Sequence, residues 1–386
     1  MALRCWWASL AWVLLAFSSI ARAAAVGEIP LPADQAVDEV DAAKLEGNPA
    51  TSVFARWPED LVLAPVPGHS SELGWSLALG AGYFLPQESD DQPASIVGAM
   101  AMGAENGSHA AGLGGSFHWL QDRLRLVVLA GDLTYNYRFW GIGNDAGQNG
   151  RHLDIRQDGQ FGYALVMYEL FQHFYTGIGV LGGRSEVALR HWSPPVSELP
   201  DPSLELTLGA FEMTSKIDTR DDLYFPTRGS MTKLSYSLYR DWMGSDFSAE
   251  IGKFDTNIYR PVAQGDVIAV RAMYRTASGD APFFLLSSFG GKTDLRGYDT
   301  GRYRDKDMYA VQGEYRWRLN PRWVLTGFAG VGEVASSPRE FFHNPLPAAG
   351  VGARYMLSRK HQVSLSADWA VGKNGSQFYF GIGEAF

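Results

Sequence analysis

The sequence predicts an all-β protein, a transmembrane antiparallel up-and-down β-barrel of 16 strands. Three observations predict it. The chain begins with a secretory signal, apolar side chains alternate with small or polar ones from about residue 72 onward, and the connections are alternately short and long. In outer-membrane barrels one face of each strand meets lipid, the other lines the lumen, and outer loops exceed periplasmic turns in length. A soluble sandwich shows the same alternation, but the signal and the terminal Phe386 favour the barrel.

Residues 1–23 are predicted to be a signal peptide. Arg4 provides the positive start, residues 5–17 form an apolar run too short to span a bilayer, and residues 21–23 read Ala-Arg-Ala, a small-residue cleavage site. The only cysteine, Cys5, lies within this segment. The sequence therefore predicts no disulfide and no cysteine-ligated metal in the mature protein.

Residues 24–50 are acidic and poor in aromatic side chains, which predicts a short disordered periplasmic leader. The barrel is expected to occupy residues 51–386. The whole chain holds 33 basic and 42 acidic residues, and this balance argues against nucleic acid as a partner. After the signal, no run of eighteen residues is apolar, so strands are the predicted means of crossing a membrane.

The apolar face of each strand is expected to meet lipid. The alternation is clearest near residues 73–83, 127–139, 309–319 and 363–371. In the second of these segments it assigns one set of side chains to lipid, namely Val127, Leu129, Leu133, Tyr135, Tyr137 and Phe139. It assigns the intervening set to the lumen, namely Ala130, Asp132, Thr134, Asn136 and Arg138.

Strand parity completes the count. Between residues 72 and 386, fifteen strands show a clear alternation of apolar and polar side chains. Because the long loops are expected outside the cell, the first of these strands must run toward the periplasm. Because the chain starts in the periplasm, one strand is missing, and residues 51–66, which contain Pro58, are the candidate. Sixteen strands then place residues 278–305 outside, between the eleventh and twelfth strands.

This long loop does not have the composition of a disordered segment. Residues 289–305 carry Leu295, Tyr298 and Tyr303, which favour burial, and four glycines that permit tight turns. Arg296 lies among apolar neighbours, as expected if the loop folds inward and brings a cation to a carboxylate. A solvated surface loop is the alternative that composition allows.

The stretch Gly-Gly-x-x-x-Leu-Arg-Gly-Tyr followed by Gly-Arg-Tyr-Arg resembles the inward-folded sixth loop of the outer-membrane protein 85 superfamily, the BamA/TamA-like surface antigen group. The similarity runs from about residue 73 to 386 and includes a periplasmic turn at 218–229. The resemblance implies a barrel in the bacterial outer membrane that inserts or transports protein or lipid. It also implies a loop motif inside the lumen, made of Leu295, Arg296, Gly297 and Tyr298.

The resemblance further implies carboxylate partners for the loop arginine. One is expected at Glu314, on the strand that follows the loop, and we predict that Arg296 pairs chiefly with it. The other is expected on the next strand, where Gly330 occupies the place of the family's aspartate. Glu333 could substitute only if that strand bulges.

The first and last strands are expected to form a weak seam. The last strand, 377–386, carries Gly381 and Gly383, which pack poorly in sheets. We interpret the seam, with Phe378, Phe380 and Phe386, as a lateral gate that offers a strand edge to a client chain. The alternative is a seam that closes normally, with Glu384 at the periplasmic interface.

The predicted partners are the lipid bilayer, client outer-membrane proteins, and a separate periplasmic scaffold protein. The scaffold is predicted because residues 24–72 are too few for the POTRA (polypeptide-transport-associated) modules usual in the family. The alternative functions are a passive pore and a surface antigen or adhesin. No cofactor, no metal and no enzymatic activity are predicted, because the eight histidines are scattered and the set at Ser336, Glu340 and His343 lies on a single loop.

Overall fold

The computed structural model describes residues 61–86, 94–190, 203–222, 225–262, 265–358 and 363–386. The predicted signal peptide at 1–23 and the predicted leader at 24–50 lie outside the described residues. Among the helices of the described ranges, none is both long and apolar enough to cross a bilayer.

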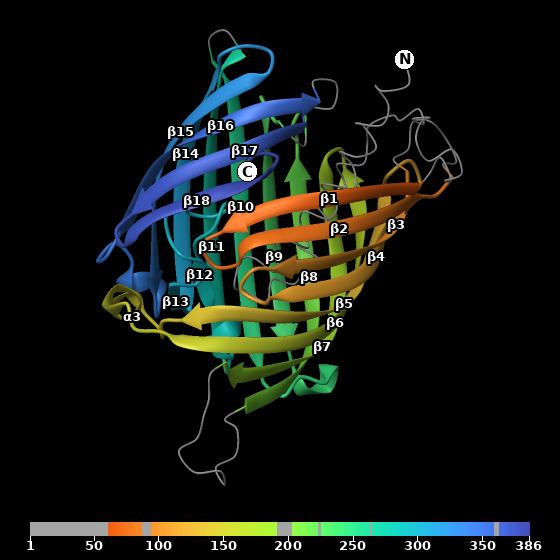
Figure 1. The fold of residues 1–386 in the computed structure, drawn as a ribbon. Helices are drawn as coiled ribbons and strands as arrows, with labels where there is room; N and C mark the ends of the chain where they lie inside the picture. Colours follow the sequence, from red (N-terminus) through yellow and green to blue (C-terminus); the bar gives the residue numbers. More distant parts are fainter. Residues whose placement is uncertain (1–60, 87–93, 191–202, 223–224, 263–264, 359–362) are drawn as a thin grey trace.

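Sixteen strands of the described chain close into one antiparallel barrel, in which neighbours along the sequence pair side by side except that β11 pairs with β14 (Figure 1). The intervening pair, β12 (Ser287–Phe289) and β13 (Tyr303–Asp305), forms its own two-stranded sheet. The barrel strands on the N-terminal side of the loop are β1 (Leu61–Ser70), β2 (Gly74–Phe84), β3 (Ile96–Ala104), β4 (His109–Trp119), β5 (Leu124–Phe139), β6 (Leu153–Phe171), β7 (Phe174–Leu189), β8 (Ser203–Asp218), β9 (Gly229–Tyr239), β10 (Ala249–Pro261) and β11 (Val267–Gly279). Those on its C-terminal side are β14 (Asp307–Arg318), β15 (Trp323–Ala335), β16 (Leu346–Ser358), β17 (Val363–Gly372) and β18 (Gly375–Ile382).

The predicted total of 16 strands is confirmed, and the long loop joins the eleventh and twelfth of them. The first strand ends further along the chain than predicted. Its described part spans residues 61–70, which overlaps the predicted 51–66 at residues 61–66 and continues to residue 70, and residues 51–60 lie outside the described part. β1 pairs with β2 along its whole length, although it contains Pro65 and Pro67.

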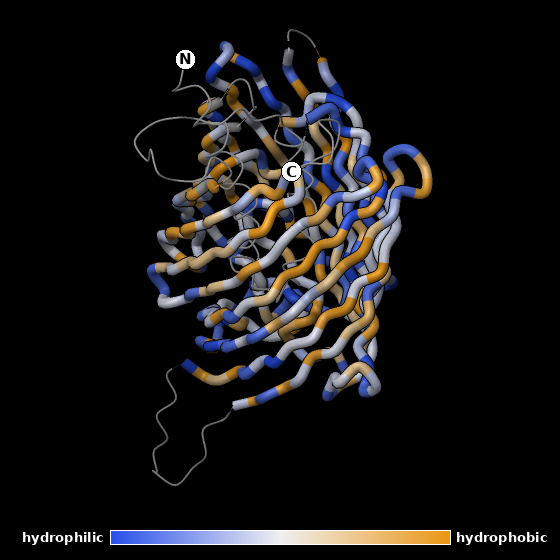
Figure 2. Tube along the Cα trace, turned by 90° about the vertical axis from the view of Figure 1, so that its right-hand side faces the viewer, coloured by the Kyte–Doolittle hydropathy of each residue, from blue (hydrophilic) through white to orange (hydrophobic). Residues whose placement is uncertain are grey.

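The predicted faces are correct for β2, β14 and β17. Large apolar side chains such as Trp75, Leu79, Trp317 and Trp369 are exposed on the outside of the barrel. Residues between them, such as Ala78, Glu314 and Asp368, are buried on the inner face. Hydrophobic positions therefore alternate with small or hydrophilic ones along many strands, as the colours in Figure 2 show. Such an apolar outer wall suits a lipid environment.

For β5 the predicted faces were wrong. Tyr135 and Tyr137 are 5% exposed and lie inside, and the Phe139 ring contacts the Phe283 ring of the long loop at 4.7 Å between centroids. Asp132 is exposed on the outside. The physical reason is that apolar residues of the long loop fill the lumen here, so the inner face of β5 is apolar. The outward face of β5 becomes polar over its second half.

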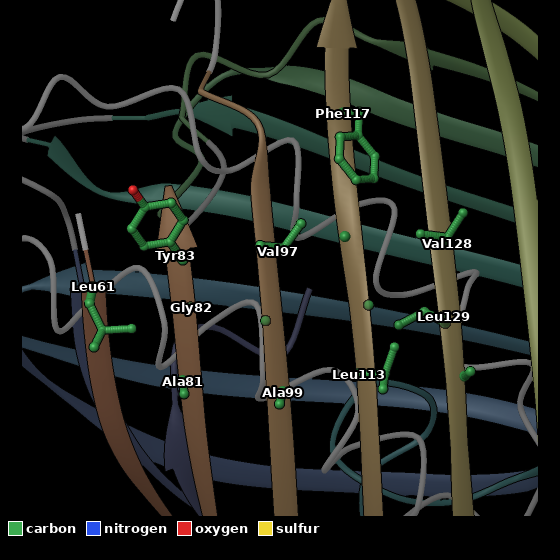
Figure 3. A pocket seen from close by; sticks show the side chains of 14 residues that line it. Leu61, Ala81, Gly82, Tyr83, Val97, Ala99, Leu113, Phe117, Val128 and Leu129 are labelled. Atoms are coloured by element: carbon green, nitrogen blue, oxygen red, sulfur yellow. The ribbon is translucent and has the colours of Figure 1, made fainter. Parts of the chain in front are cut away.

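The lumen is filled unevenly. Apolar side chains of β5 to β10 pack around Phe284 and Leu286 of the long loop. The walls made by β14, β16 and β17 instead present buried charged residues. On the outer face of β1 to β5, a shallow apolar depression of about 530 Å³ is lined by side chains that include Tyr83, Leu113 and Phe117 (Figure 3).

Candidate functional site

The loop between β11 and β14 folds into the lumen. Three of its rings, Phe289, Tyr298 and Tyr303, pack against one another with centroids 5.6–5.8 Å apart. They belong to a buried cluster that includes Leu295 and wall residues of β14 to β16. The predicted burial of Leu295, Tyr298 and Tyr303 is confirmed, and apolar packing gives the loop one fixed position.

A second loop covers the first. The short helix α3 (Asn144–Asn149) lies against β13. The Gly143 N–H donates to the Arg304 carbonyl at 2.7 Å, and Arg302 Nε donates to the Gly147 carbonyl at 2.9 Å. Asn144 Nδ2 also reaches the Val334 carbonyl at 2.6 Å. The first two bonds tie the loop after β5 to the inward loop, and the third ties it to β15.

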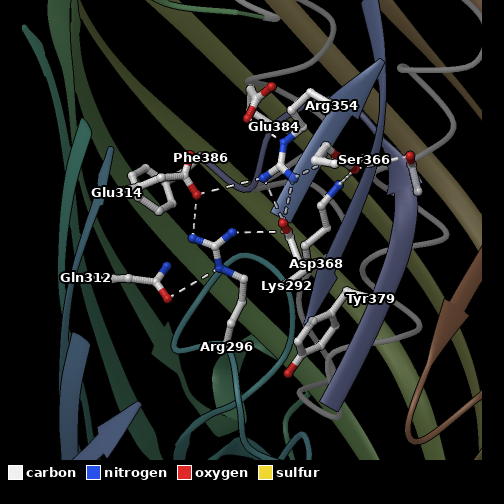
Figure 4. A network of polar contacts seen from close by, with 12 residues as sticks. Lys292, Arg296, Gln312, Glu314, Arg354, Ser366, Asp368, Tyr379, Glu384 and Phe386 are labelled. Carbon is white, nitrogen blue, oxygen red and sulfur yellow. Dashed lines mark hydrogen bonds and ion pairs between the residues drawn. The ribbon is translucent and has the colours of Figure 1, made fainter. Parts of the chain in front are cut away.

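Arg296 is fully buried and makes two ion pairs. Its Nη2 lies 2.6 Å from Glu314 Oε2, and its Nη1 lies 3.1 Å from Asp368 Oδ2 (Figure 4). The guanidinium also lies over the Phe328 ring, with its carbon 3.4 Å from the ring centroid. The predicted pair with Glu314 is confirmed, and a charge-assisted contact of this kind is among the strong hydrogen bonds of proteins.

The second carboxylate does not come from β15. The place of the expected aspartate, Gly330, faces the Leu295 side chain, and a β-carbon there would lie 2.8 Å from Leu295 Cδ1. Asp368 on β17, three strands further around the wall from β14, supplies the charge instead. Glu333 is used elsewhere, because it accepts bonds from backbone N–H groups of the next outer loop.

Two further arginines extend the cluster. Arg354 contacts Asp368 at 2.5 Å and Glu384 at 2.9 Å, and Arg316 contacts the second oxygen of Glu314 at 2.8 Å. All of these groups are buried. Three arginines thus face three carboxylates, a balanced arrangement that offsets the high cost of removing each charge from water.

The position of the C-terminus corrects two expectations. β18 ends at Ile382, and Gly383, with φ +74°, turns the chain inward. Glu384 therefore joins the arginine cluster instead of lying at the periplasmic interface. Phe386 is not part of the seam: its carbonyl accepts a bond from Arg316 at 2.7 Å, and its ring packs beside Tyr259 and Val267 inside the barrel.

The inward loop also holds the last strand. Lys292 Nζ donates to the carbonyls of Ile382 at 3.4 Å and Gly383 at 3.1 Å, and to the Ser366 hydroxyl. The Gly297 N–H donates to the Tyr379 hydroxyl at 3.1 Å. Because β18 forms one side of the seam, these bonds couple the loop to the seam.

Gly297 is required by its surroundings. Its φ is +113°, and an added β-carbon would lie 3.0–3.1 Å from the backbone of Val371 and Gly372. Gly291 has a similar φ of +103°, but there the nearest atom would be 3.5 Å away. We expect Gly297→Ala to lower the midpoint of thermal unfolding more than Gly291→Ala does, by an amount equivalent to about 1–3 kcal/mol. Equal effects of the two variants would mean that the loop does not press against the wall.

The seam between β1 and β18 is sparsely paired. Among the described residues, His69 and Phe380 are the only pair in register between these strands. The other contacts here are a polar contact of His69 Nδ1 with the Phe378 carbonyl at 3.4 Å and ring packing. The His69 ring lies 5.8 Å from the Phe378 ring, and the Trp75 ring of β2 lies 6.4 Å from the Phe380 ring, between centroids. The assignment of Phe378 and Phe380 to the seam is therefore confirmed.

A buried acid lies at the outer end of the seam strand. Glu72, in the turn between β1 and β2, is buried beside Tyr135, and neither carboxyl oxygen has a hydrogen-bond partner in the described part of the chain. Burial raises the pKa of Glu72 to about 8, although the neighbouring Tyr135 hydroxyl and then the positive charges of Arg138 and Arg304 act in the opposite direction. Glu72 is thus mostly protonated at neutral pH.

This shift predicts a pH dependence. An unfolded glutamate titrates near pH 4.3, so the folded state loses stability as pH rises from there to about 8, by up to about 1.4 kcal/mol per pH unit. Glu72→Gln cannot titrate, and we expect its stability to change less over this range. Urea unfolding of parent and variant between pH 5 and 9 tests this. Parallel pH profiles would show that Glu72 does not titrate as inferred.

Sequence reasoning missed Asp368, Arg354 and Arg316 as members of the cluster. The alternation did place Asp368 and Arg316 on the lumen faces of their strands. The signal that could have found Asp368 is that it is the only acidic residue on the lumen face of its strand.

The model of the Omp85 superfamily domain matches residues 201–386. No curated protein sequence matches the chain. Similar solved structures include BamA from Haemophilus ducreyi lacking POTRA domains 1–3, with a TM-score of 0.62 and 14% identity over 83% of this chain and 70% of that one.

Two structures of CdiB are also similar. The protein from Acinetobacter baumannii has a TM-score of 0.56 and 14% identity over 83% of this chain. The protein from Escherichia coli has a TM-score of 0.56 and 12% identity over 91% of this chain. The chain covers 58% of the former and 69% of the latter. At these identities the likeness concerns the fold.

Proposed function

Residues 201–386 belong to the Omp85 superfamily, and from this premise we propose that the protein acts in the bacterial outer membrane, in the insertion or transport of protein or lipid. The observation that carries the proposal is the seam. Within the described residues its two strands have one pair in register, and β18 is held from inside by the buried loop.

The proposed mechanism is strand addition at this seam. Opening the contact between His69 and Phe380 exposes the unpaired backbone groups of β18, and an extended client segment can pair with such an edge. The inward loop keeps β18 in place through Lys292 and Gly297 while β1 moves away. The Arg296 ion pairs fix the position of the loop, and the loop in turn fixes the β18 edge with which a client segment would pair.

The proposed partners follow from this mechanism. They are the lipid bilayer, client outer-membrane proteins, and a separate periplasmic scaffold protein that would deliver them. The apolar depression on β1 to β5 lies next to the seam, so a client leaving it would meet an apolar outer surface.

We propose no enzymatic activity. One Ser–His–Asp arrangement is present, since Ser116 Oγ lies 3.0 Å from His118 Nε2 and His118 Nδ1 lies 2.7 Å from Asp122. However, Ser116 and His118 are each 1% exposed, so a substrate cannot reach the hydroxyl. Arg125 also makes two bonds to Asp122, and we interpret the set as a brace of the tight turn after β4.

The test is reconstitution. Liposomes that contain the purified protein are mixed with a small outer-membrane barrel unfolded in urea, and folding of this client is followed by its heat-sensitive mobility on a gel. We expect faster folding than in liposomes that contain an unrelated barrel of similar size. Equal rates, together with a large steady current in planar bilayers, would contradict the proposal and indicate a passive pore.

A further inference from the structure

The loop that joins β15 and β16, residues 336–345, turns back over the outer wall of the barrel. Glu333 of β15 is in register with Tyr309 of β14, which is in register with Tyr274 of β11. This row faces outward, yet Glu333 is only 1% exposed. The loop residues that follow it along the chain cover it.

The carboxylate of Glu333 holds the loop by its backbone. It accepts bonds from three successive N–H groups, those of Phe342 at 2.6 Å, His343 at 3.1 Å and Asn344 at 2.7 Å. Phe342 has φ +70°, a conformation that bulky residues rarely adopt and that costs free energy. The bonds to Glu333 offset this cost and hold Phe342 in the strained backbone conformation.

The result of this strain is an exposed aromatic ring. Phe342 is 80% exposed, the highest value among the large apolar side chains of the described residues. Its ring centroid lies 5.3 Å from that of Tyr309, and the neighbouring Phe341 ring packs edge-on against Tyr309 at 5.0 Å. The loop thus adds two phenylalanines to an outward tyrosine row.

We propose that loop 336–345 is a lipid anchor, which inserts Phe342 among the outer-leaflet lipids at the boundary between head groups and acyl chains. The surface is continuous with the exposed apolar wall of the same strands, represented by Val311, Tyr315 and Val351. Aromatic side chains are enriched at this depth of a membrane, because one part of the ring surface meets acyl chains and the other meets water. Because lipid covers the apolar wall next to the loop, we expect the Phe342 ring to contact lipid as well.

Single-cysteine labelling tests the anchor. Cys5 is the only cysteine of the chain, so Phe342→Cys in a Cys5→Ser background carries one environment-sensitive nitrobenzoxadiazole label. Arg339→Cys, on the exposed part of the same loop, is the matched control. In liposomes with nitroxide groups on the acyl chains near the head group, we expect the label at 342 to be blue-shifted and at least twofold more quenched than the label at 339.

Two outcomes would overturn the anchor. A label at 342 that is as polar and as weakly quenched as the label at 339 would place the ring in water. A blue-shifted label that is not quenched would place it against protein. Adding Glu333→Gln is expected to reduce quenching at 342, because the amide offers one acceptor oxygen in place of two. Heat-sensitive gel mobility shows for each variant that the barrel is folded.

Discussion

Replacing Arg296 by alanine is expected to destabilise the inward loop by about 3–5 kcal/mol and to abolish client folding. The reason is that Glu314 and Asp368 would stay buried with two arginines facing three carboxylates, and a buried charge left without its partner carries a large desolvation cost. Urea unfolding and the reconstituted folding assay measure the two effects. Arg339→Ala, at an exposed loop position, is the control and should change neither.

The charge balance can be examined separately. Adding Asp368→Asn to Arg296→Ala leaves two arginines with Glu314 and Glu384, so we expect part of the lost stability to return. The two substitutions should therefore be strongly non-additive, as is usual for residues of one ion-pair network. Simple addition of their costs would mean that the cluster does not act as a unit.

A disulfide between β1 and β18 is expected to abolish client folding without unfolding the barrel. Residues opposite each other in antiparallel strands have Cα atoms about 4.5–5.5 Å apart, which suits a disulfide. His69→Cys with Phe380→Cys should therefore cross-link β1 to β18. We expect the oxidised protein to lose client folding by at least tenfold and to regain it on reduction.

The control for this lock is a disulfide within the ordinary wall. Leu63 and Ala81 are in register between β1 and β2, and a cysteine pair there fixes β1 to its other neighbour. This variant should keep its activity whether oxidised or reduced. Full activity of the oxidised His69–Phe380 pair would exclude opening of the seam.

Much of the barrel could be predicted from local pattern. Period-two alternation and loop lengths yielded the strand number and the position of the inward loop, because both depend on short stretches of sequence. The faces of β5 could not be assigned in this way. Tyr135 and Tyr137 are apolar enough for lipid, and only the presence of Phe283 and Phe284 in the lumen makes the inner wall apolar as well.

The candidate site was predicted only in part, because some of its residues come from strands far apart in the sequence. Glu314 was predicted because alternation places it on the lumen face of the strand after the loop, where the family resemblance implies a carboxylate partner for the arginine. Asp368 was not, because it lies on a strand three positions further around the barrel from β14, and only the closed fold brings it beside Arg296. Glu384 was misplaced because alternation was extended beyond Ile382, where Gly383 turns the chain inward.

The central claim is that the loop lies inside the barrel, with Leu295 against β15. At Gly332 of β15 an added β-carbon would lie 3.0 Å from Leu295 Cδ2 and 2.9 Å from the Tyr309 carbonyl, a looser site than Gly330, where the Val311 carbonyl would be 2.6 Å away. Leu295→Cys with Gly332→Cys should therefore form a disulfide in intact outer membranes after mild oxidation. The account predicts a cross-link in most molecules and little labelling of residue 295 by an impermeant maleimide before oxidation. Absence of the cross-link in folded protein, with rapid labelling at 295, would contradict it.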